Sequence, residues 1–185
     1  MEFPETNNDG SMGKPLFSCN TSNFAWGKVA KGYVLDHQGR IWFYDLGDTW
    51  TPHVAGNGLF FESGLRARFK NPVRQIHSAT RAQLAIMRKK AKIARGGRIE
   101  KKHVGFDAGG CGCEAYLWET PDTYREVELG SSGDYEITNS SPEANEITQW
   151  LIDELKMGIR RKPQLDWIMP KINKKWTDGA PRKSL

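Results

Sequence analysis

The chain has 185 residues, of which 38% are hydrophobic and 26% are charged, and its formal net charge is +5 at pH 7. This balance lies outside the regime of low hydrophobicity and high net charge that keeps chains disordered, and the length suffices for one hydrophobic core. No apolar run approaches the length that spans a bilayer, which excludes a transmembrane segment.

Residues 1–21 are expected to form a flexible leader, because they are mostly polar and contain no apolar core of a secretory signal. The segment 10–13 (Gly-Ser-Met-Gly) is compatible with an expression remnant. The segment 16–19 (Leu-Phe-Ser-Cys) loosely resembles the end of a bacterial lipoprotein signal, although no apolar run precedes it. The compartment is left open: periplasmic or lipid-anchored if a native signal was removed, and cytoplasmic otherwise.

The next element is a predicted hairpin over residues 28–45. Its two strands, 29–35 and 40–44, are rich in β-branched and aromatic residues, and Gly39 supplies the positive φ that a short hairpin loop needs. Residues 47–64 are rich in glycine and predict a long connection with one short strand at 59–61. This connection contains Trp50, a candidate anchor for a partner.

A helix is predicted from a cap at Ser78 or Thr80 to about Arg95, where Gly96 and Gly97 stop it. Apolar residues at helical spacing form its predicted buried seam: Leu84, Met87, Ala91 and Ala94. Ile86 and Ile93 lie beside this seam. Most remaining positions are basic. We therefore expect one face to pack and the other to be cationic.

Four further strands are predicted at 104–106, 114–118, 124–129 and 135–138, joined by turns near 120–123 and 131–134. A second helix follows, with Ser141 as its cap and Pro142 in its first turn. Its predicted buried stripe consists of Ala144, Ile147, Leu151 and Leu155. Its acids Glu146, Asp153 and Glu154 are predicted to face water.

These elements predict an α+β fold: a mostly antiparallel sheet of about five to seven strands packed by two main helices. Residues 22–170 are expected to form this single domain, and residues 171–185 a basic, flexible tail.

Residues 81–102 contain nine Lys or Arg against one acid, Glu100. Such a density of positive charge attracts phosphate groups or an acidic protein surface, and the alternative is a merely solvated helix face. Together with Trp50, the candidate partner-binding residues are Arg81, Arg88, Lys89, Lys90, Lys92, Arg95 and Arg98.

The three cysteines are Cys19, Cys111 and Cys113, so at least one stays unpaired in a monomer. An oxidising compartment would favour a bridge from Cys19 to either of the others, and a reducing one would leave all three free. Cys111, Cys113 and His103 are weak candidates for a zinc or copper site, but a fourth ligand is not evident. We therefore predict no metal and no cofactor.

Six acids near strand ends are candidates for the carboxylate pair of a hydrolase: Asp45, Asp48, Glu62, Asp107, Glu114 and Glu119. No nucleophile elbow, phosphate-binding loop, dinucleotide fingerprint or HExxH motif is present. The leading hypothesis is a non-enzymatic protein-binding domain, of the bacterial inhibitor or immunity type, that recognises an acidic partner. The alternatives are a nucleic-acid-binding protein that uses the basic helix, and the hydrolase.

Overall fold

The computed structural model describes residues 11–23, 29–45, 59–69, 72–105 and 109–160. Its elements, in chain order, are β1 (Pro15–Asn23), β2 (Val29–Asp36), β3 (Arg40–Asp45), β4 (Phe60–Phe61), α1 (Glu62–Arg68), β5 (Pro72–Ser78), α2 (Arg81–Ala94), β6 (Ile99–His103), β7 (Gly110–Trp118), β8 (Thr123–Gly133), β9 (Tyr135–Asn139) and α3 (Pro142–Arg160). The predicted α+β class is confirmed.

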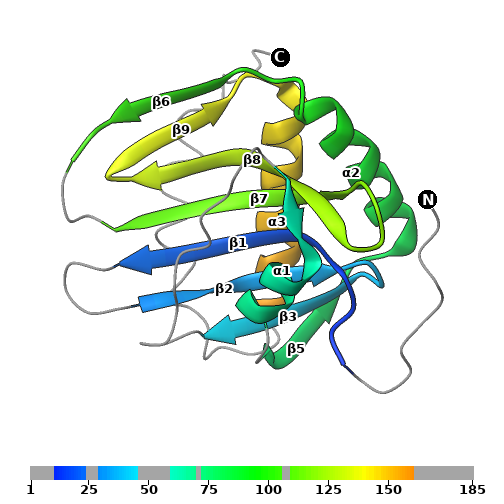
Figure 1. The fold of residues 1–185 in the computed structure, drawn as a ribbon. Coiled ribbons are helices and arrows are strands. Elements are labelled where there is room, and N and C mark those ends of the chain that lie inside the picture. The colour runs from blue at the N-terminus through cyan, green and yellow to red at the C-terminus, as the bar shows by residue number, and fades with distance from the viewer. Residues whose placement is uncertain (1–10, 24–28, 46–58, 70–71, 106–108, 161–185) are drawn as a thin grey trace, which may run out of the picture.

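The strands form one antiparallel sheet in the order β5-β3-β2-β1-β7-β8-β9-β6, and β4 adds to it by pairing with β8 (Figure 1). Strand β1 lies between β2 and β7, although its first seven residues belong to the stretch expected to be a flexible leader. Its apolar residues Leu16 and Phe17 are buried. Residues 15–21 are therefore part of the sheet and not of a flexible leader.

Helices α2 and α3 cover one face of the sheet, and α1 lies against the other (Figure 1). On the α2–α3 face, Phe17, Tyr33 and Leu129 pack with residues of both helices. On the α1 face, Leu65 and Phe69 pack with Tyr116 of β7. Each face of the sheet thus has its own hydrophobic core.

The two long helices begin where their sequences predict. Thr80 caps α2 in a capping box with Gln83, and the buried stripe of α3 contains the four predicted residues. Glu154 differs from its prediction: it is 2% exposed and accepts a hydrogen bond from Trp150 Nε1 at 3.1 Å. The i,i+4 spacing places both side chains on one helical face, so the indole satisfies the buried carboxylate.

Two predicted strand boundaries were wrong. The strand expected at 104–106 is replaced by β6, which ends at His103 and whose five residues are all exposed. The strand predicted to begin at Glu114 begins earlier, at Gly110: the glycine-rich segment before Glu114 is the first half of β7 and pairs with β1 and β8. The sheet exceeds the expected five to seven strands because β1 and β5 were not predicted as strands.

A disulfide joins Cys19 of β1 to Cys113 of β7, which are paired directly across the two strands. Cys111 is buried and free, and its sulfur lies 3.1 Å from Ser132 Oγ. The sequence left open whether Cys19 pairs with Cys111 or with Cys113, and the structure has the bridge to Cys113, between two strands at the middle of the sheet.

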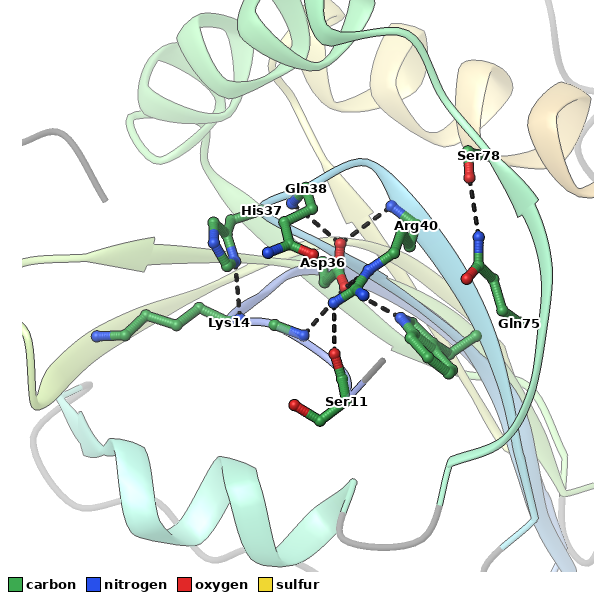
Figure 2. A network of polar contacts seen from close by, with 10 residues as sticks. Ser11, Lys14, Asp36, His37, Gln38, Arg40, Gln75 and Ser78 are labelled. Atoms are coloured by element: carbon green, nitrogen blue, oxygen red, sulfur yellow. Dashed lines mark hydrogen bonds and ion pairs between the residues drawn. The ribbon is translucent and has the colours of Figure 1, made fainter. Parts of the chain in front are cut away.

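The buried carboxylate of Asp36 organises the turn between β2 and β3 (Figure 2). It accepts hydrogen bonds of 2.9 to 3.0 Å from the backbone N–H groups of Gly13, Gln38 and Arg40 and from the Arg40 and Trp42 side chains. His37 Nδ1 accepts a further bond from the Lys14 N–H at 2.9 Å. These bonds attach the residues before β1 to the hairpin.

Candidate functional site

The basic residues predicted to bind a partner do not form one continuous cationic surface. Three of them form ion pairs with acids: Lys90 with Glu146, Arg95 with Glu119 at 3.0 Å, and Arg98 with Glu100. Arg88 is partly buried, and desolvation lowers the pKa of its guanidinium. Part of the positive charge is therefore neutralised within the domain.

Arg81, Lys89 and Lys92 are different, because all three are exposed and none forms an ion pair with the residues that the structure describes. They all lie on α2. Trp50, the remaining predicted contact, falls outside the described residues.

The outward side of α2 also exposes two large apolar side chains. Ile86 is 52% exposed and Ile93 is 58% exposed, whereas Leu84, Ala91 and Ala94 face the core. Ala82 and Lys89 are exposed as well, and together the four residues follow the spacing i, i+4, i+7, i+11, which aligns them along one side of a helix. We call Ala82, Ile86, Lys89 and Ile93 the outer α2 ridge. Their helical spacing predicted both isoleucines beside the buried seam, whereas both are exposed.

The weak metal candidates are not assembled into a site. Cys113 is consumed by the disulfide, and His103 is exposed on β6 with its ring at the edge of Tyr135. Within the described ranges, no group of three or more His, Cys, Asp or Glu is placed to hold a metal ion.

The strand-end acids proposed for a hydrolase are also dispersed. Asp45 forms an ion pair with Lys31, Glu62 with Arg66, and Glu119 with Arg95 and Arg125. Asp48 and Asp107 fall outside the described residues. Glu114 alone belongs to a cluster of acids, and its position is inside β7 instead of at the end of a strand.

Glu114 is the centre of a polar network on the α1 face of the sheet. Its Oε2 accepts hydrogen bonds from Arg68 Nη1 at 3.0 Å and from the Tyr116 hydroxyl at 2.9 Å. The Ser18 hydroxyl lies 2.7 Å from that of Tyr116, and Asn20 Nδ2 donates to Glu114 Oε1 at 3.4 Å. Arg68 therefore joins the end of α1 to the middle of the sheet.

Two more glutamates of β8 lie opposite this network. The register pairs Glu128 with Glu114 and Glu126 with Tyr116, which places these side chains on the same face. Desolvation, and then repulsion from Glu114, raise the pKa of Glu126 to about 7 and that of Glu128 to about 8. A carboxyl that keeps its proton near neutral pH can donate a hydrogen bond or a proton.

Glu114 and Glu128 border a groove of about 570 Å³ across β1, β7, β8, β9 and β6. Its middle is lined by small residues of neighbouring strands, and Lys101 and Tyr135 stand on β6 and β9. The small residues are Ser22, Gly110, Gly112, Ser131 and Gly133. Ser131 and Gly133 belong to the stretch predicted as a turn near 131–134, which the structure shows as the end of β8.

Comparison of the chain with protein-family models, curated proteins and solved structures gives no significant match. No helix among the described residues is long and apolar enough to cross a membrane. Function is therefore inferred from the chemistry of the side chains.

Proposed function

We propose that the protein is a non-enzymatic binding domain that recognises an acidic protein partner through the outer α2 ridge and the cations beside it. Inhibitors and immunity-type proteins act in this way, by covering a surface of another protein without catalysing a reaction. The observation that carries the proposal is the exposure of Ile86 and Ile93 on either side of Lys89.

The ridge combines the two properties that a protein interface uses. Its isoleucines offer apolar area to be removed from water, and Arg81, Lys89 and Lys92 offer charges that form no ion pair with the described residues. A partner segment with apolar side chains flanked by Asp or Glu would complement both. The ion pairs of Lys90 and Arg95 border the ridge and limit its positive charge to that side of the helix.

Other occupants fit the ridge less well. A nucleic acid would use a broader basic surface and aromatic side chains for stacking, and α2 has none of the latter. A lipid surface would need more apolar area than two isoleucines. A second copy, paired antiparallel along α2, would place Lys89 near Lys89 of its mate, and like charges repel.

The test uses two variants, both of which change only exposed side chains of α2. The charge-reversal triple variant (Arg81→Glu, Lys89→Glu, Lys92→Glu) and the double variant (Ile86→Ser, Ile93→Ser) are compared with the wild type in quantitative affinity purification and then in calorimetry with the purified partner. Both variants should lose the partner, whereas the control Lys102→Glu, on exposed β6, should retain it.

The nucleic-acid alternative gives a different pattern. It predicts binding of a labelled duplex that falls steeply with salt and is insensitive to the isoleucine substitutions. Retention of a protein partner by both ridge variants would contradict the proposal.

A further inference from the structure

The groove on the α1 face is independent of the α2 surface and lies on the opposite side of the sheet. Its volume of about 570 Å³ falls in the range of small-molecule sites. Gly110, Gly112 and Glu114 follow one another at alternate positions of β7, so all three point to this face. The groove exists because two of these three positions carry no side chain.

One wall of the groove holds the acid Glu128. Its side chain is partly buried, and its carboxyl forms no hydrogen bond or ion pair with the described residues. Its neighbour Glu114 differs, because Arg68 and Tyr116 already donate to it. A buried carboxyl without a donor is costly to ionise, and a ligand that donates to it would remove that cost.

The opposite wall does not neutralise Glu128. Lys101 Nζ lies 3.9 Å from the centre of the Tyr135 ring, which holds this ammonium over the aromatic face. The acids of the lining are Glu114, Glu128 and Asp134, and its base is Lys101. Arg68 already forms an ion pair with Glu114, so Glu128, once ionised, is a carboxylate of the groove with which an incoming cation can pair.

We propose that this groove binds a small organic cation whose guanidinium or amine group donates to Glu128. The Ser22 and Ser131 hydroxyls and the Asn20 amide line the same space and can accept or donate the remaining hydrogen bonds. The glycines allow the ligand to approach the backbone of β7, which a side chain would prevent. Because the pKa of Glu128 is raised to about 8, binding of a cation releases a proton from that carboxyl near neutral pH.

The probe is butylguanidinium, and its control is butylurea, which has the same shape without the charge. Titration of the ¹⁵N-labelled full chain above pH 8 is followed by amide chemical shifts. Butylguanidinium should bind saturably, shift the amides of Gly112, Glu128 and Ser131, and bind at least about tenfold more tightly than butylurea.

Three variants locate the site. Glu128→Gln should weaken binding by about tenfold, and Asp153→Asn, on α3 across the sheet, should not change it. Gly110→Leu should abolish binding by filling the groove, because a Cβ at this position meets only the Ser132 carbonyl oxygen, at 3.7 Å.

The result that overturns the proposal is the absence of saturable binding, equal binding of the two probes, or shifts that map outside the groove. If Gly110→Leu does not fold, Glu128→Gln and the neutral probe still decide the outcome. None of these measurements involves the α2 ridge, so the two proposals fail separately.

Discussion

Replacing Glu128 by glutamine should change how the stability of the domain depends on pH. Burial and the neighbouring Glu114 and Glu126 raise the pKa of Glu128 from the ordinary 4.5 to about 8, against smaller opposing effects of Arg68 and Lys101. Between these two pH values the unfolded chain loses the proton and the folded chain keeps it. The free energy of unfolding therefore falls as pH rises through this window and is lowest above pH 8.

The magnitude follows from the same two values. Each pKa unit corresponds to about 1.4 kcal/mol, so the rise from 4.5 to about 8 sets an upper bound of about 5 kcal/mol. Solvent at the groove screens the carboxyl, and we expect roughly 1 to 3 kcal/mol. Glutamine keeps the shape of the protonated acid and cannot ionise.

The assay is urea-induced unfolding of the wild type and Glu128→Gln at about pH 5 and about pH 9. The two proteins should be similarly stable at the lower pH, and the variant should be more stable by roughly 1 to 3 kcal/mol at the higher pH. The control Asp153→Asn should follow the wild type at both. An equal loss of stability in the wild type and in Glu128→Gln between the two pH values would contradict the raised pKa, because it would show that this carboxyl ionises freely in the folded state.

Four further predictions concern the fold. Leu151→Ala should lower the free energy of unfolding by about 2 to 5 kcal/mol, since the side chain is buried between α3 and the sheet; an unchanged melting temperature would contradict this packing. Asp36→Asn should cost roughly 2 to 4 kcal/mol in urea unfolding, because an amide cannot accept all five hydrogen bonds of the carboxylate, and a loss below about 0.5 kcal/mol would show that the network is dispensable. Thr80→Ala should cost about 1 kcal/mol by the same assay through loss of the α2 cap, and a stability equal to the wild type would argue against that cap. Alkylation under denaturing, non-reducing conditions should label one thiol, Cys111, by intact mass, whereas labelling of three would exclude the Cys19–Cys113 bridge.

The helices and the first hairpin could be predicted because their signals are local. Thr80, Pro142 and Gly39 mark starts and turns through backbone geometry that depends on few neighbours. The apolar period of α3 likewise identified its buried stripe correctly.

The missed strands depend on partners that are distant in sequence. The second half of β1 is polar, and it is a strand because β2 and β7 bond to it on both sides. Strand β6 is fully exposed and has no apolar alternation, so its pairing with β9 defines it. Long-range pairing of this kind leaves no mark in a single sequence.

The arrangement of the candidate site residues could be predicted only in part from the sequence, for a similar reason. Alternation along β8 could have shown that Glu126 and Glu128 share a face, but only the register with β7 brings Glu114 opposite them. On α2, apolar residues at 84, 86, 87, 91, 93 and 94 are compatible with two different buried faces. In the folded domain Leu84 and Ala91 pack into the core, and Ile86 and Ile93 are exposed on the opposite side of the helix.

The proposed recognition of an acidic partner is tested most directly by photo-crosslinking from the ridge itself. A benzophenone amino acid replaces Ile86 in one protein and, as the control, exposed Ile99 of β6 in another. We expect a protein adduct from position 86 alone, with the crosslinked peptide carrying apolar residues flanked by Asp or Glu. Equal adducts from both positions, or none from position 86 under conditions in which a partner co-purifies, would contradict it.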